Sequence, residues 1–312
     1  MRPADFLRLL LLSAIWGASF LFMRIAAPSF GPIPLILCCL GSAALFFAPL
    51  LLRRDVRRQL VRYRWPLAVV GVFNSAVPFS LLAFSTLSLE AGFTALLNAT
   101  TPLFAAAVGA IWLRIALARG QILGLVLGFA GVAILSWGNL DFREGGTGWA
   151  IVASLAAGLS YGISAHIAKR GLADVSSVVV ATGTMIAATV ATLPLGLWLW
   201  PATPPDPTSW ASAIALGIAC TALAYLLYFD LIAKAGATNA STVTFVVPVF
   251  AIVWGNLLLD EQLTLQIVLG MAVTLLGTAF AIGLVGKRPV GSRPVTNRPV
   301  VGKTTDDGED RS

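Results

Sequence analysis

Charged residues are scarce in this chain of 312 residues. Asp, Glu, Lys and Arg together make up 11% of it, whereas 58% of its residues are hydrophobic. A soluble domain carries about 25% charged residues. The shortage of charge therefore excludes an ordinary soluble protein and indicates a chain that lies in a lipid bilayer.

Residues that bind metals or perform catalysis are also few. The chain has one histidine, His166, and three cysteines, Cys38, Cys39 and Cys220, and their spacing matches neither a metal site nor a disulfide framework. It has no His-Glu-x-x-His motif, no paired aspartates deep in a span and no glycine-rich phosphate loop. We therefore predict no cofactor, no metal and no enzymatic activity, and we expect the cysteines to be small packing residues.

Long apolar runs are what the chain has instead. Each is about 20 residues long, the length that a helix needs to cross a bilayer. The first run is longer than the apolar part of a cleaved signal peptide, so we expect a permanent helix. The predicted spans are 6–27, 34–52, 66–87, 91–113, 120–138, 148–168, 175–200, 209–232, 237–258 and 264–285. The predicted fold class is an all-α membrane protein with ten transmembrane helices.

The basic residues are distributed unevenly over the loops. If the N-terminus lies in the cytoplasm, only Arg24 and Arg143 of the 21 Lys and Arg residues fall outside. This distribution follows the positive-inside rule and places both termini in the cytoplasm. We interpret the net charge of +7 as an orientation signal, in preference to a patch for nucleic acid or anionic lipid at residues 53–64.

The chain also contains an internal repeat. Pro102 coincides with Pro248 at a shift of 248 − 102 = 146 residues, and Trp16-Gly17-Ala18-Ser19 coincides with Tyr161-Gly162-Ile163-Ser164 at a shift of 145. Many transporters are built from repeated membrane units of this kind. Further pairs that coincide at 146 are Phe104 and Phe250, Gly109 and Gly255, Gly124 and Gly270, and Gly131 and Gly277.

Each repeat contains five spans, and five is an odd number. The second repeat must then enter the membrane from the opposite side, so we predict two inverted five-helix units, 1–145 and 146–285, related by a pseudo-two-fold axis in the membrane plane. Residues 286–312 combine proline and charge without an apolar period, which predicts a disordered cytoplasmic tail. The sequence does not determine the oligomeric state.

Polar and aromatic residues inside the spans mark a candidate substrate site. A polar side chain in lipid is costly and usually faces the bundle interior. We predict that a small-molecule substrate contacts Trp16, Ser19, Phe20, Asn74, Phe79, Asn98, Thr101, Tyr161, Ser164, Tyr225, Tyr228 and Thr244. For any single residue of this set, helix packing or an interfacial aromatic belt is the alternative.

Three prolines within spans are predicted to kink their helices. A proline removes the hydrogen bond to the carbonyl four residues earlier. For Pro78, Pro102 and Pro248 these carbonyls belong to Asn74, Asn98 and Thr244. Unsatisfied backbone in a membrane is tolerated only against protein or a wet cavity. We therefore expect these carbonyls to face a central cavity, where they could hold the ammonium group of an amino acid.

Three residues are candidates for a charge role. Arg24 either meets a substrate carboxylate near the outer mouth or anchors its helix at the interface, which we favour. His166 is either a proton relay or, more simply, a hydrogen-bonding group at a helix end. Asp230 is the acid most nearly inside a span, but Lys234 lies four residues on and is its expected partner.

These features together resemble the EamA-type transporters of the drug/metabolite transporter superfamily, over about residues 6–285. The resemblance rests on Trp16-Gly17-x-Ser19, its echo Tyr161-Gly162-x-Ser164, the prolines Pro102 and Pro248, and Glu261 followed by Gly270. It is strongest for bacterial amino-acid exporters, including those of aromatic amino acids. The resemblance implies a ten-helix protein of the bacterial inner membrane that exports amino acids or related amphipathic metabolites by alternating access. One departure is that Glu261 has Ile115 as its counterpart in the first repeat.

Other functions fit the sequence less well. A transporter of sugar phosphates or nucleotide sugars needs fixed cations at its site, whereas the basic residues here lie mostly in loops. Proton-driven multidrug export favours a carboxylate deep in a span, which this chain lacks, so the coupling ion stays open. A purely structural membrane protein would not need polar groups at three helix kinks.

Overall fold

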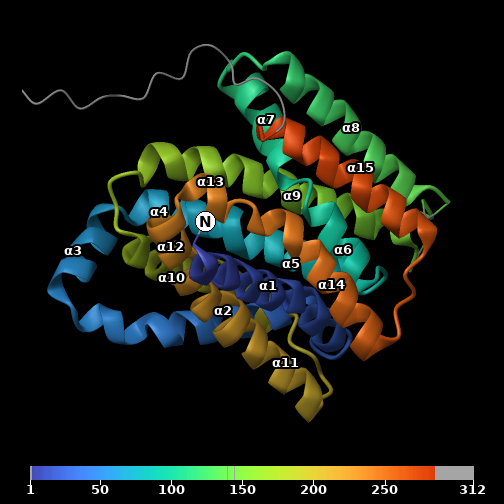
Figure 1. Cartoon of the computed structure of the whole chain (residues 1–312). Coiled ribbons are helices and arrows are strands. Elements are labelled where there is room, and N and C mark those ends of the chain that lie inside the picture. The colour runs from blue at the N-terminus through green and yellow to red at the C-terminus, as the bar shows by residue number, and fades with distance from the viewer. Residues whose placement is uncertain (1, 139, 144, 285–312) are drawn as a thin grey trace, which may run out of the picture.

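The computed structural model describes residues 2–138, 140–143 and 145–284, and over these residues every regular element is a helix (Figure 1). The predicted tail at 286–312 lies outside the described residues. The elements in chain order are α1 (Pro3–Phe30), α2 (Pro32–Phe47), η1 (Ala48–Leu52), α3 (Arg54–Arg62), α4 (Arg64–Gly71), η2 (Val72–Ala76), α5 (Val77–Ser85), α6 (Ala91–Asn98), α7 (Thr101–Trp112), α8 (Arg119–Ser136), α9 (Thr147–Gly171), α10 (Ser177–Trp198), α11 (Pro207–Gly217), η3 (Ile218–Leu223), α12 (Ala224–Ala235), α13 (Ala237–Ala240), α14 (Val243–Leu259) and α15 (Leu265–Ala281).

Eight segments are long and apolar enough to cross a membrane. Several of them join consecutive elements, so that α4, η2 and α5 form one segment, Arg64–Ser85. The predicted spans at 237–258 and 264–285 correspond to two apolar helices of 17 residues each, α14 and α15. The described residues are therefore helical in every regular element, with eight candidate spans of ample length and two shorter apolar helices.

Glycine and aspartate residues mark several of the helix boundaries. Gly31 adopts a φ of 77° between α1 and α2, and Gly236 adopts 84° after α12, which is backbone that glycine adopts at little cost. Asp206 caps α11, since its carboxylate accepts a hydrogen bond from the Ser209 amide at 2.9 Å. Hydrogen bonds from the Ser209 side chain and backbone lower the pKa of Asp206 to about 2.

The first helix of each half packs mainly against the other half. On α1, Gly17 lies so close to Phe250 and Ala251 of α14 that an added Cβ would come within 2.7 Å of the Phe250 Cβ. On α9, Gly162 lies equally close to Phe104 and Ala105 of α7. These two contacts join the residues that coincide in the repeat. The glycines of the repeated motif are therefore needed for close helix approach.

α8 and α15 form a pair at one side of the bundle, next to α7 (Figure 1). Glycines on both helices bring the two backbones together, because a Cβ on Gly277 would meet the Gly128 backbone and one on Gly124 would meet the Ala281 backbone. This contact has the small-residue character of helix interfaces in membranes.

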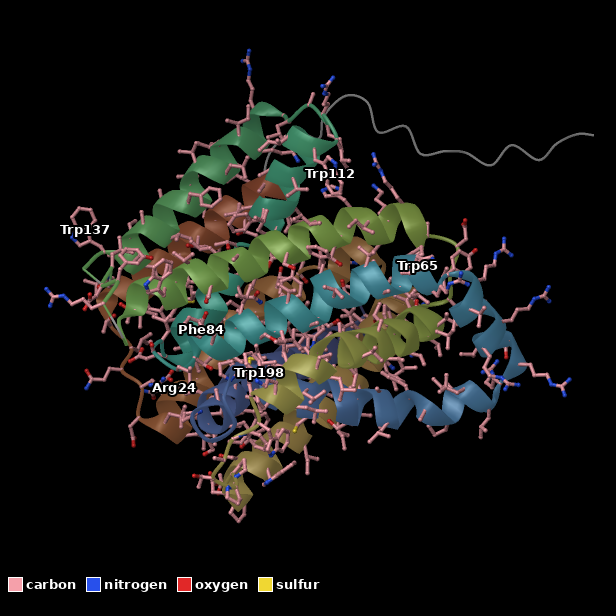
Figure 2. All side chains as sticks on the ribbon, turned by 180° about the vertical axis from the view of Figure 1, so that it is seen from behind. Arg24, Trp65, Phe84, Trp112, Trp137 and Trp198 are labelled. Carbon is pink, nitrogen blue, oxygen red and sulfur yellow. The ribbon has the colours of Figure 1, made fainter. Side chains whose placement is uncertain are left out.

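Exposed aromatic side chains lie toward both ends of the bundle. Trp65 and Trp112 lie toward one end, and Trp137 and Trp198 toward the other (Figure 2). All four are more than half exposed. Tryptophan is enriched at the two membrane–water interfaces, so these positions are consistent with a bundle that spans a bilayer.

Candidate functional site

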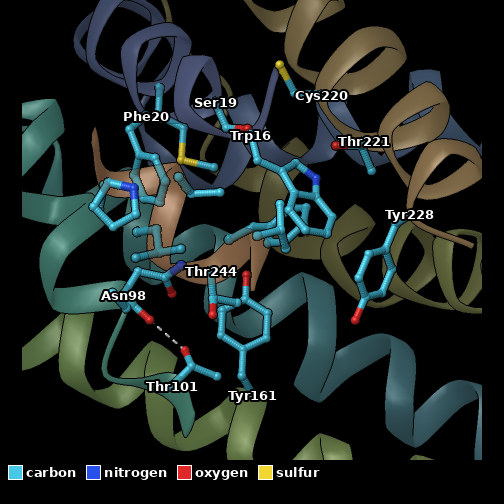
Figure 3. Close-up of a pocket in the computed structure, with 18 of the residues that line it drawn as sticks. Trp16, Ser19, Phe20, Asn98, Thr101, Tyr161, Cys220, Thr221, Tyr228 and Thr244 are labelled. Atoms are coloured by element: carbon cyan, nitrogen blue, oxygen red, sulfur yellow. Dashed lines mark hydrogen bonds between the residues drawn. The ribbon is translucent and has the colours of Figure 1, made fainter. Parts of the chain in front are cut away.

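A central cavity of about 300 Å³ lies between the helices of the two halves. Eleven of the twelve predicted substrate residues line it, and Figure 3 shows several of them facing one space. They are Trp16, Ser19, Phe20, Asn74, Phe79, Asn98, Thr101, Tyr161, Tyr225, Tyr228 and Thr244. Ser164 does not line the cavity. It is buried, and within the described residues its hydroxyl has no hydrogen-bond partner.

The lining is aromatic and polar but carries no charge. Among the described residues, no Lys, Arg, His, Asp or Glu side chain lines the cavity. Trp16 and Tyr228 pack together with their ring centroids 5.2 Å apart. Asn98 contributes a buried side-chain oxygen that finds no donor in the described part of the chain. Such a site suits a solute with an apolar body and a small polar group.

Two π-helical segments place polar residues at the cavity. η2 and η3 begin at Val72 and Ile218, which are 146 residues apart. Both halves therefore have a π-helical segment at the same point of the repeat. Within η3, the Thr221 hydroxyl donates a hydrogen bond to the Leu216 carbonyl, five residues earlier, at 2.9 Å. Single π-helical turns occur frequently at functional sites because they redirect side chains.

The two π-helical segments are also linked across the repeats. The Asn74 side-chain amide of η2 donates a hydrogen bond at 3.0 Å to the hydroxyl of Tyr225, which lies two residues after the end of η3. Cys220, which the sequence analysis assigns to packing, lines the cavity. It coincides with Asn74 at the shift of 146, and this coincidence is the signal that could have identified it.

The three prolines have different structural roles. Pro248 lies inside α14, as expected of a kink. Pro102 instead lies in the first turn of α7, after a break at Ala99 and Thr100, and Pro78 lies in the first turn of α5, after η2. The Asn98 carbonyl, which we expected to be free, accepts a hydrogen bond from the Thr101 hydroxyl at 2.8 Å (Figure 3). The side-chain oxygen of Asn98 is thus the unpartnered acceptor, and its backbone carbonyl is not.

The cavity is sealed toward Arg24. On four helices, the lining residue nearer Arg24 is buried, whereas the lining residue one turn farther from Arg24 is partly exposed. Phe20 and Met23 seal α1, Leu82 seals α5, Ala95 seals α6 and Val247 seals α14, each less than 9% exposed. The partly exposed neighbours are Trp16, Phe79, Asn98 and Thr244. The wall formed by these residues is therefore more closely packed toward Arg24.

Beyond the seal, side chains join the helix ends that meet there. Arg24 donates hydrogen bonds to the carbonyls of Thr86 and Leu87 at 2.5 and 3.0 Å, at the end of α5. Glu261 accepts hydrogen bonds from the amides of Ala91 and Gly92 at 2.8 and 3.4 Å, at the start of α6. A carboxylate at a helix N-terminus and a cation at a C-terminus are both favourable.

Glu90 lies beside this cluster, just outside the helix that follows it. Partial burial, and then the negative charge of Glu261, raise the pKa of the Glu90 carboxyl, and Arg24 opposes the shift. The ionised form of Glu90 is therefore disfavoured in the sealed arrangement.

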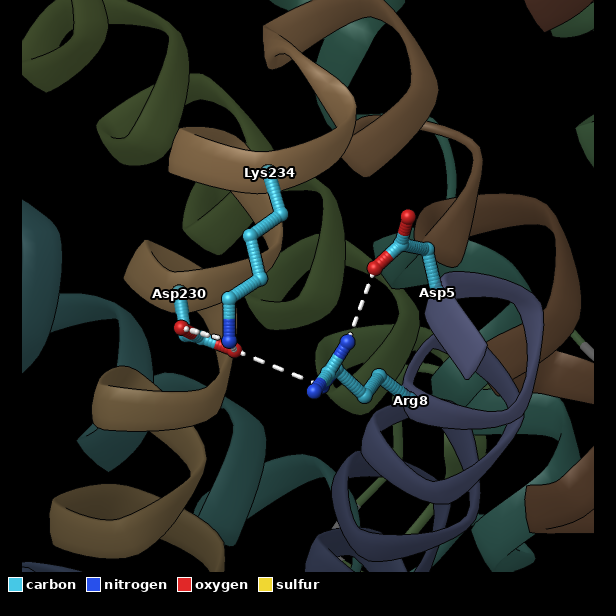
Figure 4. Close-up of polar contacts among 4 residues, drawn as sticks. All are labelled: Asp5, Arg8, Asp230 and Lys234. Carbon is cyan, nitrogen blue, oxygen red and sulfur yellow. Dashed lines mark hydrogen bonds and ion pairs between the residues drawn. The ribbon is translucent and has the colours of Figure 1, made fainter. Parts of the chain in front are cut away.

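The other two candidates for a charge role also lie outside the cavity. Asp230 pairs with Lys234 at 2.7 Å, as the four-residue spacing predicts, and with Arg8 of α1 at 3.4 Å (Figure 4). Arg8 in turn pairs with the buried Asp5 at 2.8 Å. His166 contacts the Ala105 carbonyl at 2.8 Å. Arg24, His166 and Asp230 thus join helices to one another.

Comparison with known proteins identifies the family. The model of the EamA-like transporter family matches residues 6–137 and again residues 148–283. The chain belongs to the EamA-like transporter family. Both matches contribute to the cavity, for example through Trp16 and Asn98 from the first and Tyr161 and Tyr225 from the second.

Curated relatives of this EamA protein are distant but cover most of its length. An Archaeoglobus fulgidus protein named as an uncharacterized transporter is 24% identical, with 84% of this chain and 92% of that protein covered. A Streptantibioticus cattleyicolor protein named as a probable terminal-alkyne amino-acid exporter is 26% identical, with coverages of 81% and 84%. One solved crystal structure has a TM-score of 0.62 at 19% identity and covers 91% of this chain and 99% of its own, which shows a shared fold.

Proposed function

We propose that this EamA protein exports amino acids, including aromatic ones and related amphipathic metabolites, by alternating access around the central cavity. The observation that carries this proposal is the uncharged, aromatic-lined cavity of about 300 Å³ between two EamA-like units. The Streptantibioticus cattleyicolor relative, a probable amino-acid exporter, favours the same substrate class.

The architecture that we propose is ten transmembrane helices in two inverted repeats, residues 1–145 and 146–285. Three observations support it. The two π-helical segments begin 146 residues apart. The Gly17–Phe250 and Gly162–Phe104 contacts are reciprocal. The two shorter apolar helices, at 17 residues, are at the lower limit of about 17 residues for a transmembrane span.

We further propose that both termini lie in the cytoplasm of a bacterial cell and that the chain faces inward in this conformation. The positive-inside distribution places Arg24 at the outer end of its span. The sealed end of the cavity is then the outer end, and a cytoplasmic solute enters from the open side. An exporter that waits for substrate in this state binds it from the compartment in which it accumulates.

The cavity wall fits an amino acid better than a phosphorylated sugar. The buried Asn98 side-chain oxygen is an unpaired acceptor that an ammonium group can satisfy. The rings of Trp16, Tyr161 and Tyr228 provide an apolar wall and the negative faces that attract a cationic group. A phosphate dianion would need Arg or Lys in the wall, and none lines it.

Flux into proteoliposomes tests the proposal. Purified protein is reconstituted and uptake of labelled amino acids is measured with and without a pH gradient. We expect saturable flux of aromatic amino acids, and Trp16→Ala or Asn98→Ala should reduce it about tenfold or more, because each removes a wall or acceptor group of the cavity. Trp137→Ala is the matched control, since that side chain is 80% exposed at the end of the bundle. Absence of flux for every amino acid would refute the substrate class, and flux indifferent to the gradient would refute proton coupling.

A further inference from the structure

The helix α3 lies across one end of the bundle between α2 and α4 (Figure 1). It has nine residues and is therefore about 13 Å long, which is too short to cross a bilayer. Its inner side is held by apolar contacts, because Val56 is buried among Leu172, Val175 and Val179 of the second half. Leu60 reaches Gly183 of α10. The helix is thus fixed in place along the membrane end.

The outward side of α3 carries a row of arginines. Arg54, Arg58 and Arg62 follow one another at four-residue steps and therefore lie on one helix face. All three are exposed. No ion pair involves them within the part of the chain that the structure describes, because the nearby carboxylate of Asp55 pairs with Arg53 at 3.2 Å. The row therefore has three guanidinium groups without a protein anion to neutralise them.

Exposed apolar side chains flank the arginine row. Leu52 is 85% exposed, Val61 63% and Trp65 71%. The Arg62 and Arg64 guanidinium groups lie 5.5 and 5.9 Å from the ring centroids of Tyr63 and Trp65. Cationic heads beside aliphatic and aromatic groups are typical of helices that lie in the headgroup region, where phosphate and acyl chain meet.

We propose that the Arg54–Arg58–Arg62 row is a binding site for the headgroups of anionic phospholipids in the adjacent leaflet. Guanidinium groups bind phosphate through paired N–H donors, and clustered arginines beside a transmembrane helix attract anionic lipid. The apolar flank favours a lipid over a soluble acidic partner, because Leu52, Val61 and Trp65 can enter the acyl boundary. Lipid held there would also brace the contact between α3 and the second half.

Lipid retention by the full-length protein tests this site. The protein is purified in mild detergent, offered equal amounts of phosphatidylglycerol and phosphatidylcholine, and analysed by native mass spectrometry. We expect phosphatidylglycerol to be retained in about tenfold excess or more, because three cations face the headgroups. The variant R54Q/R58Q/R62Q should lose that excess, and R54K/R58K/R62K should keep part of it, since lysine keeps the charge but loses the paired donors.

A charge-matched control separates the row from net charge alone. R2Q/R114Q/R119Q removes three exposed arginines elsewhere and should retain lipid as the wild type does. Added phosphatidylglycerol should raise the melting temperature of the wild type and of this control but not of R54Q/R58Q/R62Q, since a ligand stabilises only the state that binds it. Equal retention by the wild type and R54Q/R58Q/R62Q would overturn the site, whatever the transported substrate proves to be.

Discussion

At the scale of single residues, a side-chain hydrogen bond between Asn74 and Tyr225 joins the two repeats at the cavity. The amide of Asn74 comes from η2 and the hydroxyl of Tyr225 from α12, at 3.0 Å. Tyr228, one turn further on α12, lines the same cavity but packs through its ring on Trp16. Two tyrosines on one helix thus contribute in different ways, one through its hydroxyl and the other through its ring.

Tyr225→Phe should therefore destabilise the protein and Tyr228→Phe should not. Losing the hydroxyl at Tyr225 leaves the Asn74 amide without its partner, which costs about 1 kcal/mol in the free energy of unfolding. Within the described residues the Tyr228 hydroxyl makes no hydrogen bond that would be lost. Thermal melting of both variants, followed by circular dichroism without substrate, makes the comparison. Equal melting temperatures for the two variants would show that the Asn74–Tyr225 bond does not hold the repeats.

At the scale of helices, the sequence predicted the spans and most of the cavity wall. Apolar length alone located the helices, and the rule that polar groups face inward selected Trp16, Asn98 and Tyr225, which do line the cavity. The π-helical segments could not be predicted from the sequence. A π-turn depends on the balance of backbone hydrogen bonds and has no characteristic residue pattern. Pro102 was expected to kink a continuous helix, whereas it lies in the first turn of α7 after the break at Ala99 and Thr100. Pro78 directly follows η2 within the continuous segment Arg64–Ser85.

The α8–α15 contact yields a prediction at this scale. Gly277→Ala should lower the free energy of unfolding by about 1–3 kcal/mol, because the added Cβ would overlap the Gly128 Cα at 2.6 Å and force the backbones apart. Gly120→Ala on α8 is the matched control, since a Cβ there has open space around it and alanine favours the helix. Unfolding curves in mixed micelles measure both. A neutral Gly277→Ala would mean that the two helices are free to separate.

At the scale of the whole molecule, transport requires the sealed end to open, and the Glu261 cluster lies where α14 of one repeat meets α6 of the other. The Glu261 carboxylate holds two amides of α6, and Arg24 of α1 holds two carbonyls at the end of α5. The charge of Glu90, in contrast, is unfavourable in this cluster, because burial and the negative charge of Glu261 raise the pKa of its carboxyl. A raised carboxyl pKa means that the sealed state binds the proton more tightly, so sealing is favoured below that pKa and weakened as the pH rises through it.

Glu261→Gln should consequently open the sealed end, whereas Glu90→Gln should not. Loss of a charged hydrogen bond costs about 1.5 kcal/mol or more, which shifts the ratio of open to sealed states about tenfold. A cysteine in the cavity wall reports the change when Cys38 and Cys39 are replaced by alanine. Because Cys220 is itself buried, it is also replaced by alanine, and Ser19→Cys serves as the partly exposed reporter in the cavity wall. A small membrane-impermeant methanethiosulfonate should label this cysteine from the cytoplasmic face in the background protein and from both faces in Glu261→Gln. Labelling from outside should be no faster in Glu90→Gln, which removes a repulsion and the same charge. Labelling of the background protein from the outer face alone would contradict the inward-facing orientation that we propose. The sealed end would then be the cytoplasmic end.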